Sequence, residues 1–216
     1  MSEASATDAP VSKARRRRES KQRILLAAEE EFANRGFNGS TVKAIALRAG
    51  LPKANVLYYF PTKLALYRQV IEDVFNAWLE AADRFADYDD PREALTRYIH
   101  SKMDLSRTRP NGSKVWANEI LHGAPIIQDY LEPRLHEWAQ SRESWIQAWI
   151  DAGKLRPVEP RYLLFMIWAS TQHYADFGTQ IETLNGGEPL SDEQFETAKR
   201  TLTDIILNGL LPRQGA

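Results

Sequence analysis

A chain of 216 residues, 43% hydrophobic and 26% charged, suits a globular protein with one large domain or two small ones. It has no cysteine, which excludes disulfides and thiolate metal sites and fits a cytoplasmic location. Its longest apolar run, residues 163–169, is too short to span a bilayer, and its N-terminus lacks the apolar centre of a signal peptide. We therefore expect no association with a membrane.

The net charge of −1 conceals two unlike parts. Residues 1–63 carry 12 lysines and arginines against 6 acidic residues, a balance of +6, whereas residues 64–216 carry 16 against 23, a balance of −7. A basic N-terminal third on an acidic body indicates that one end meets a polyanion. The alternative is that the run of four arginines, a pattern also found in solubilising tails, accounts for most of this excess.

Helical periodicity dominates the first third of the chain, and no sustained alternation predicts a strand. Ser20 can cap a first helix, and Gly36 is its predicted stop. Ser40 or Thr41 caps a second, short helix that ends at Gly50. The three predicted helices cover about residues 20–34, 41–50 and 52–60.

Prolines and glycines divide the rest of the chain into longer helices. The predicted helices cover about residues 62–87, 91–107, 113–122, 125–152, 161–183 and 192–208. Pro133 lies inside the fourth of these and is expected to kink or divide it. The sequence thus predicts an all-α protein in which three short helices precede a larger helical body.

The second and third helices, joined by a tight turn at Gly50, have the arrangement of a helix-turn-helix. Val56 and Phe60 are spaced i,i+4 and hold the third helix inward, which leaves Lys53 and Asn55 outside to read base edges in a major groove. The further candidates for DNA contacts are Thr41, Lys43, Ala54, Tyr58, Tyr59 and Lys63, most of them through phosphates.

The segment KARRRRESK precedes the first helix and concentrates positive charge at residues 13–21. Residues 1–18 are predicted to form a flexible basic arm. Such an arm can follow the phosphate backbone or enter the minor groove, where it gains affinity by releasing counterions.

The stretch IWASTQHYADF, residues 167–177, gathers polar groups directly behind an apolar run. The spacing of Ser170, His173 and Asp176 resembles a catalytic triad, but no Gly-x-Ser-x-Gly elbow surrounds the serine. The histidines show no metal-binding spacing either, so we expect neither an enzyme nor a cofactor or metal. One alternative is a core in which these polar groups satisfy one another or the backbone.

A pocket for a small polar molecule explains the same stretch better. Trp168 beside Gln172 suits a flat heterocycle, because the ring packs on the indole while the amide pairs with imide groups. The candidate ligand-binding residues are Tyr67, Trp78, Trp168, Thr171 and Gln172, and weaker candidates are Phe75, Lys102, Trp116 and Glu119. Phe165, Ile181 and the last helix (Phe195, Leu202, Ile205, Ile206) are predicted to pack against a second copy as a four-helix bundle.

Residues 20–66 resemble the DNA-binding domain of the TetR family of repressors in both order and spacing. The matching positions are Ile24, Ala27, Phe32, Gly36-Phe37, Thr41, Ile45-Ala46, Ala49-Gly50, Tyr58, Phe60, Lys63 and Leu66. Two positions depart from the pattern: Pro52 replaces a capping serine or threonine, and Leu57 replaces a frequent tyrosine, which puts a phosphate contact at 57 in doubt.

The resemblance implies a homodimer that binds operator DNA and releases it when a ligand occupies the larger domain. It divides the chain into the arm (1–18), a helix-turn-helix domain (19–66) and a ligand-binding and dimerisation domain (67–212).

Three later segments resemble the pyrimidine-utilisation repressors of this family: ILHGAP at 120–125, WIDAGKLRPVEP at 149–160 and FMIWASTQHYADF at 165–177. This second resemblance implies that the effector is uracil or thymine. The alternatives are a different small-molecule effector on the same scaffold, or a helical binding module without DNA function.

Overall fold

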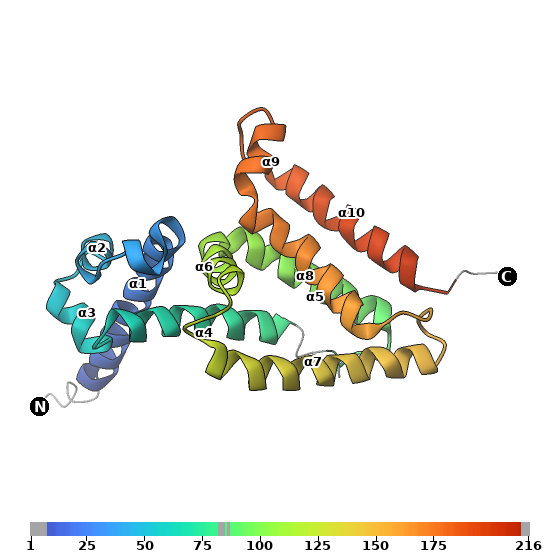
Figure 1. Ribbon diagram of the computed structural model, residues 1–216, viewed down its shortest axis with the longest axis horizontal. Helices are drawn as coiled ribbons and strands as arrows, with labels where there is room; N and C mark the ends of the chain where they lie inside the picture. The colour runs from blue at the N-terminus through green and yellow to red at the C-terminus, as the bar shows by residue number, and fades with distance from the viewer. Residues whose placement is uncertain (1–7, 82–84, 86, 213–216) are drawn as a thin grey trace, which may run out of the picture. The chain divides into compact units, whose positions relative to one another are not determined.

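A computed structural model describes residues 8–81, 85 and 87–212, and the regular elements among them are helical, as predicted (Figure 1). The chain forms two compact units, residues 1–73 and 74–216. The division falls inside helix α4 (Lys63–Ala81), later than the boundary expected at residue 66. Within the described residues, no helix combines the length and apolar character that crossing a membrane requires.

The first unit contains α1 (Asp8–Gly39), α2 (Val42–Arg48) and α3 (Lys53–Tyr59). Its core is formed by the buried side chains of Ile24, Phe32, Ile45, Val56 and Leu66. Gly50 makes the turn between α2 and α3 with a φ of 62°, where a side chain would meet the guanidinium of Arg23 at 2.9 Å. The glycine therefore permits the close turn on which the helix-turn-helix depends.

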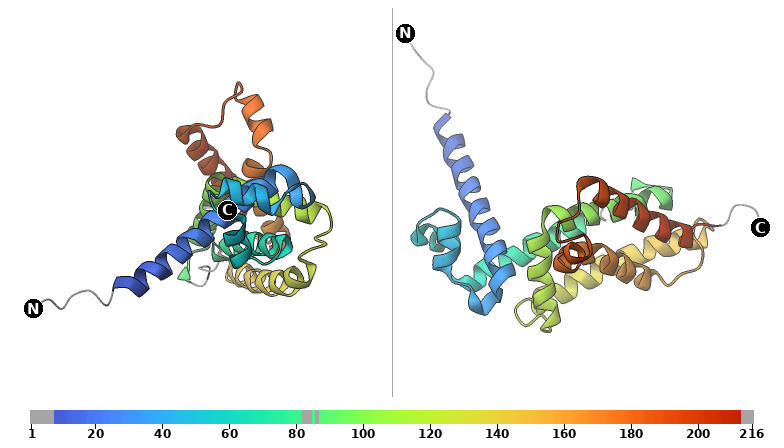
Figure 2. Two further views of the ribbon diagram at one scale, coloured as in Figure 1. Left: turned by 90° about the vertical axis from the view of Figure 1, so that its left-hand side faces the viewer. Right: turned by 90° about the horizontal axis from the view of Figure 1, so that it is seen from above.

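The basic segment ahead of residue 20 differs from its prediction. Residues 8–18 continue α1 as helix and project past α2 and α3 (Figure 2), so the prediction of a flexible arm is wrong for them; residues 1–7 lie outside the described part. Alanine, arginine and lysine favour helix, and Arg15 pairs with Glu19 one turn later at 3.3 Å. Gly36, the predicted stop, has a φ of 65° and kinks the helix before its final residues.

The second unit packs α5 (Pro91–Thr108) against α8 (Pro160–Asp176), with α6 (Pro110–Leu121), α7 (Gln128–Asp151) and α10 (Asp192–Leu210) around this pair. A large buried cluster fills the space between them, to which α5 contributes Leu95, Tyr98 and Ile99, and α8 contributes Leu163, Leu164 and Ile167. Figure 1 shows α5 and α8 running side by side in the middle of this unit.

Two helices of the second unit differ from their predictions. Pro133, expected to kink or divide its helix, does not divide it: α7 continues past the proline to Asp151, with one interior backbone donor missing. The single helix expected over 161–183 is two helices, since Phe177 has φ −112° and ψ 31° and separates α8 from α9 (Gly178–Leu184). The start of α10 agrees with its prediction, with Ser191 and Gln194 in a capping box, but the helix runs through the expected stop at Gly209 to Leu210.

Candidate DNA-binding surface and effector cavity

Helix α3 turns its apolar side inward and its polar side to solvent. Val56 and Phe60 are buried, whereas Lys53, Ala54 and Asn55 are exposed and Tyr58 is 72% exposed. The side chains of Lys53 and Asn55 make no hydrogen bond or ion pair within the described part of the chain. The first turn of α3 therefore carries an ammonium and an amide that are free to meet an external partner.

Helix α2 is held in place by hydrogen bonds and ion pairs with α1. The guanidinium of Arg23 donates to the carbonyl of Ala49 at 2.6 Å, which satisfies the end of α2. Arg48 pairs with Glu30 and, at 3.5 Å, with Glu31. Buried Ala46 allows α2 and α3 to pack closely. These contacts fix the orientation in which α3 presents Lys53 and Asn55.

Of the predicted phosphate contacts, Lys63 and Thr41 already have partners in the fold. The ammonium of Lys63 donates to the carbonyls of Phe37 at 2.7 Å and Ser40 at 3.0 Å, and lies 4.4 Å above the centre of the Phe37 ring. Thr41 caps α2 by accepting a hydrogen bond from the Ala44 amide at 3.1 Å. Lys43 is exposed, and Tyr59, packed edge-on against Tyr58, is half-buried.

Lys63→Met is expected to lower the free energy of unfolding of the first unit by about 1–3 kcal/mol, because two carbonyls of the α1–α2 connection lose a charged donor. Unfolding in urea, followed by circular dichroism, measures the change. Lys43→Met is the matched control, since its exposed ammonium has no partner among the described residues. Equal stabilities of the two variants would contradict a structural role for Lys63.

The second unit contains a partly open cavity of about 260 Å³ between five of its helical segments. Aromatic rings form most of its wall, and few polar groups reach it. The lining residues are Phe75, Trp78, Leu79, Tyr98, Lys102, Trp116, Ile120, Leu135, Trp138, Trp168 and Gln172. A cavity of this size and composition suits a small flat ligand.

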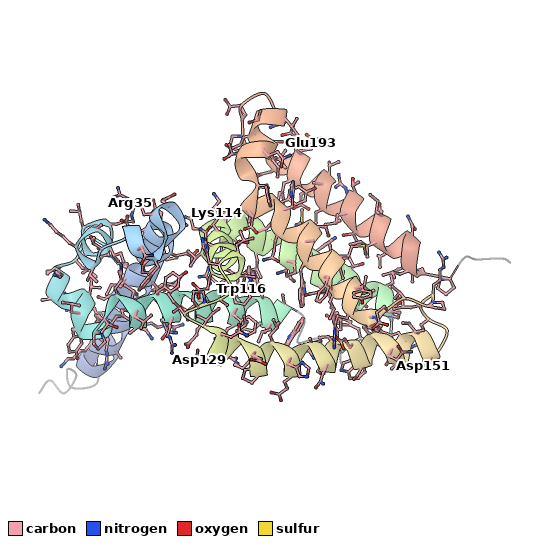
Figure 3. The ribbon with its side chains drawn as sticks, viewed as in Figure 1. Arg35, Lys114, Trp116, Asp129, Asp151 and Glu193 are labelled. Atoms are coloured by element: carbon pink, nitrogen blue, oxygen red, sulfur yellow. The ribbon has the colours of Figure 1, made fainter. Side chains whose placement is uncertain are left out.

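One wall of the cavity is a cluster of rings from α4 and α6. Phe75 and Trp116 are stacked, with ring centres 5.3 Å apart and planes at 6°. Trp78 meets Trp116 edge-on at 5.2 Å. Trp116 can be located on α6 in Figure 3. Because these rings hold one another, this wall is formed before any ligand arrives.

Another part of the lining comes from Tyr98 on α5 and Trp168 on α8. The indole N–H of Trp168 donates to the Tyr98 hydroxyl at 2.7 Å. Burial raises the pKa of Tyr98, so the phenol stays protonated throughout the neutral range. Trp138 on α7 packs beside Trp168 with ring centres 5.9 Å apart. The hydrogen bond thus orients the Trp168 ring that faces the cavity.

The two remaining polar groups of the cavity are Lys102 and Gln172. Lys102 is only 3% exposed, and its ammonium lies 4.1 Å from the centre of the Trp78 ring. Burial lowers the pKa of Lys102 to about 7, against the opposing attraction of Asp176. Neither the Lys102 ammonium nor the Gln172 amide makes a hydrogen bond or ion pair within the described residues.

The predicted ligand residues divide into two groups. Trp78, Trp168 and Gln172 line the cavity, as do the weaker candidates Phe75, Lys102 and Trp116. Tyr67, Thr171 and Glu119 are outside its lining. Sequence reasoning did not single out Tyr98 or Trp138 for this site; the i,i+4 spacing of Tyr98 and Lys102 was the available signal for one of them.

The three residues outside the lining have other structural partners. Tyr67 belongs to the first unit, where its ring lies 4.9 Å from Phe32 and 5.0 Å from Phe37. Thr171 is fully buried, and its hydroxyl donates to the Ile167 carbonyl at 2.7 Å. Glu119 accepts a hydrogen bond from the Ile126 amide at 2.7 Å.

The residues that resembled a triad are engaged with separate partners. The Ser170 hydroxyl donates to the Met166 carbonyl at 2.6 Å, and the His173 ring stacks on Phe177 with centres 5.0 Å apart. Asp176 accepts a hydrogen bond from the Ser113 hydroxyl at 2.6 Å. The structure therefore does not assemble a nucleophile and base from this stretch.

Apolar side chains remain exposed on α8 and α10. Phe165 is 48% exposed and Ile205 is 66% exposed. Ile181 and Leu202 are half-buried, whereas Phe195 and Ile206 are buried in the core of their own unit. The residues predicted for an interface between copies thus divide into an exposed part and a core part.

Comparisons with known proteins agree with both units. A family profile described as "Bacterial regulatory proteins, tetR family" matches residues 24–70, and one described as "YcdC-like protein, C-terminal region" matches residues 71–213. The HTH-type transcriptional regulator RutR of Escherichia coli (strain K12) is 39% identical over 193 residues, 89% of this chain and 91% of that protein.

Solved structures share the fold. The transcriptional regulator SCO4942 from Streptomyces coelicolor superposes with a TM-score of 0.68 at 25% identity, over 88% of this chain and 98% of that one. AibR, solved with isovaleryl coenzyme A and operator DNA, superposes with a TM-score of 0.67 at 17% identity, over 86% of this chain and 97% of that one.

Proposed function

The chain belongs to the TetR family of DNA-binding transcriptional regulators, and we propose that it is a dimeric repressor that leaves its operator when uracil or thymine enters the aromatic cavity. Regulators of this family bind operator DNA and small-molecule ligands. The relatives that the chain matches are transcriptional regulators, not enzymes. The operator contacts, the effector and the dimer are the parts that we propose.

The proposal for operator binding rests on the exposed first turn of α3. Lys53 presents an ammonium suited to guanine O6 and N7, and Asn55 presents an amide suited to adenine N6 and N7. The basic extension of α1 supplies a second contact, because its side chains at 13–19 are exposed along a helix that belongs to the same unit. Such charges interact with phosphates independently of sequence.

Lys53→Ala and Asn55→Ala are each expected to weaken operator binding about tenfold or more, since a contact to a base edge contributes about 1–3 kcal/mol. A gel shift with the promoter next to the protein's own gene measures the effect. Lys154→Ala, an exposed lysine of the second unit, is the control that should bind as the unaltered protein does. Full affinity in both α3 variants would contradict the proposed reading helix.

The proposal for a pyrimidine effector rests on one observation: an aromatic cavity is lined by both the Trp168 ring and the Gln172 amide, and that amide has no hydrogen-bond partner among the described residues. A pyrimidinedione is flat and carries alternating carbonyl and N–H groups, which an amide can pair with while the ring stacks on indole. The segments at 120–125 and 165–177, which resemble the pyrimidine-utilisation repressors, contribute Ile120, Trp168 and Gln172 to the lining.

Calorimetry against a panel of nucleobases tests the effector. We expect uracil and thymine to bind more tightly than adenine, because adenine lacks the alternating carbonyl and N–H groups that the Gln172 amide is proposed to pair with. Binding of another ligand in place of both pyrimidines would support a different effector on the same scaffold.

The proposed dimer uses the exposed apolar side chains of α8 and α10, including Phe165 and Ile205. In a dimer, each copy contributes one α3 helix to one half of a palindromic operator. The distance between the two α3 helices therefore decides whether both can enter the major groove at the same time. The effector releases the DNA because it binds more tightly to the dimer whose α3 helices are wrongly spaced than to the dimer that fits the operator. Sedimentation of the intact protein should give a dimer, and Phe165→Glu should shift it toward the monomer.

A further inference from the structure

Lys102 is a buried cation without an acceptor. Nearly all of its surface is removed from water, yet it has neither a hydrogen bond nor an ion pair among the described residues. Among the described residues, its ammonium lies against the face of Trp78, 4.1 Å from the ring centre. Buried charges are ordinarily paired, because desolvation of an unpaired ammonium is costly. An unpaired buried ammonium of this kind is expected in a binding site, where the ligand supplies the missing acceptor.

The charged groups around Lys102 leave the cavity side of the ammonium open. Asp176 on α8 attracts it, but its carboxylate is engaged by Ser113 and also faces Lys114 on α6 and His173 on α8. The charge of Arg142 on α7 acts on Tyr98. The described lining contains no carboxylate. A negative charge inside the cavity would therefore meet Lys102 without an acidic competitor on the wall.

Helical spacing puts Lys102 and Gln172 at one level of the cavity. Lys102 lies one turn after Tyr98 on α5, and Gln172 lies one turn after Trp168 on α8. Tyr98 and Trp168 are joined by their hydrogen bond, and Asp176, one further turn along α8, is within electrostatic reach of Lys102. The amide and the ammonium thus face the same space in neighbouring positions.

We propose that Lys102 is the anion-binding group of this cavity, and that the effector is a flat ring bearing a negative charge or a readily lost N–H proton at the edge that meets Lys102. This inference rests on the proposed function, since it assigns chemistry to the same effector site. For a ring with an acidic N–H, the proton passes from the ring nitrogen to the neutral amine, which leaves a ring anion beside an ammonium. No other reactant is needed.

Three ligands of similar size and shape differ in charge: uracil, the more acidic 5-fluorouracil, and barbiturate, which is an anion at neutral pH. Differences among their affinities therefore report mainly on charge. Calorimetry with the full chain should give affinities that rise in this order. In Lys102→Met the three affinities should become similar. Affinity should fall about tenfold for uracil and about a hundredfold for barbiturate, because a charge-assisted hydrogen bond is about twice as strong as a neutral one. Lys154→Met, an exposed lysine, should preserve the rising order.

A measurement on the unaltered protein keeps the inference testable if Lys102→Met fails to fold. Above about pH 7 the unliganded amine is largely neutral, so barbiturate must bring about the uptake of a proton as it binds. Calorimetry at about pH 8.5 in two buffers of different ionisation enthalpy measures the number of protons taken up on binding. We expect close to one proton for barbiturate and close to none for uracil.

The outcomes separate the two proposals. A rising order that Lys102→Met abolishes, or the proton uptake, supports anion binding by Lys102. Uracil binding with no preference for barbiturate and no loss in Lys102→Met overturns the inference and leaves the pyrimidine effector standing. Failure of all three rings to bind overturns both.

Discussion

Lys102→Met is expected to raise the free energy of unfolding of the unliganded second unit by about 1–4 kcal/mol at pH 7, the range seen when buried ion pairs are replaced by apolar side chains, because Lys102 has no hydrogen bond or ion pair among the described residues to lose. Methionine fills the space of the lysine stem, and it needs no acceptor. The same substitution weakens effector binding. A residue that destabilises the free protein and strengthens its complex is the expected pattern for a ligand-binding group.

The stability gained by Lys102→Met depends on pH, and the lowered pKa of Lys102 decides the direction of that dependence. The Lys102 amine has a pKa of about 7 in the folded chain against an ordinary value of 10.5. Between these values the unfolded chain holds more protons, so the stability of the lysine protein rises with pH. Below about pH 7 the cost of the buried ammonium is present in full. The advantage of Lys102→Met is therefore largest there and falls as the pH approaches about 10.5.

Tryptophan fluorescence in urea measures this change selectively, because all six tryptophans follow residue 77 and lie in the second unit. Unfolding at about pH 6, about pH 8.5 and about pH 10.5 covers the window. Lys154→Met is the reference of opposite sign: this exposed lysine donates to the Asp89 carbonyl at 2.6 Å, so its replacement should lower the stability of the unit. A variant less stable than the unaltered protein at every pH would show that Lys102 has a stabilising partner.

Gln172→Leu is expected to weaken uracil binding about a hundredfold, close to 2.7 kcal/mol, while operator binding in the absence of uracil stays unchanged. Leucine keeps the bulk of the side chain but removes the amide, so the buried N–H and carbonyl groups of the ligand lose their partner. Fluorescence titration follows the loss, because Trp78, Trp116, Trp138 and Trp168 line the cavity.

The control for this variant is Gln140→Leu, which makes the same replacement at an exposed position of α7. It should bind uracil as the unaltered protein does. If Gln172→Leu loses operator binding as well as uracil, the residue has a folding role. If it keeps full uracil affinity, the amide is not the group that recognises the ring.

The first unit was largely predictable because its signals are local. Three residues illustrate this: Thr41 starts a helix, Gly50 makes the turn and Val56 faces inward. In each case the residue type alone predicts the structure of the few residues around it. The partners of Lys63 were not predictable in this way. Its two acceptor carbonyls, at Phe37 and Ser40, lie more than twenty residues away, and only the packed structure brings them to the ammonium.

The cavity was predictable in part, for the same physical reason. Trp168 and Gln172 are one turn apart on a single helix, so their spacing already places them together. Tyr98 and Trp138 come from two other helices, and the packing of α5 and α7 against α8 decides that they share the cavity. The same packing places Thr171, next to Gln172, in the core, where its hydroxyl bonds to its own helix.

Uracil bound in the aromatic cavity should reduce the affinity of the protein for its operator. The direct measurement is fluorescence anisotropy of a labelled promoter fragment bound to the protein, titrated with uracil and, in parallel, with adenine. We expect uracil to release the DNA and adenine to leave it bound, and we expect Gln172→Leu to stay bound at uracil concentrations that release the unaltered protein. DNA that remains bound at saturating uracil would contradict this expectation.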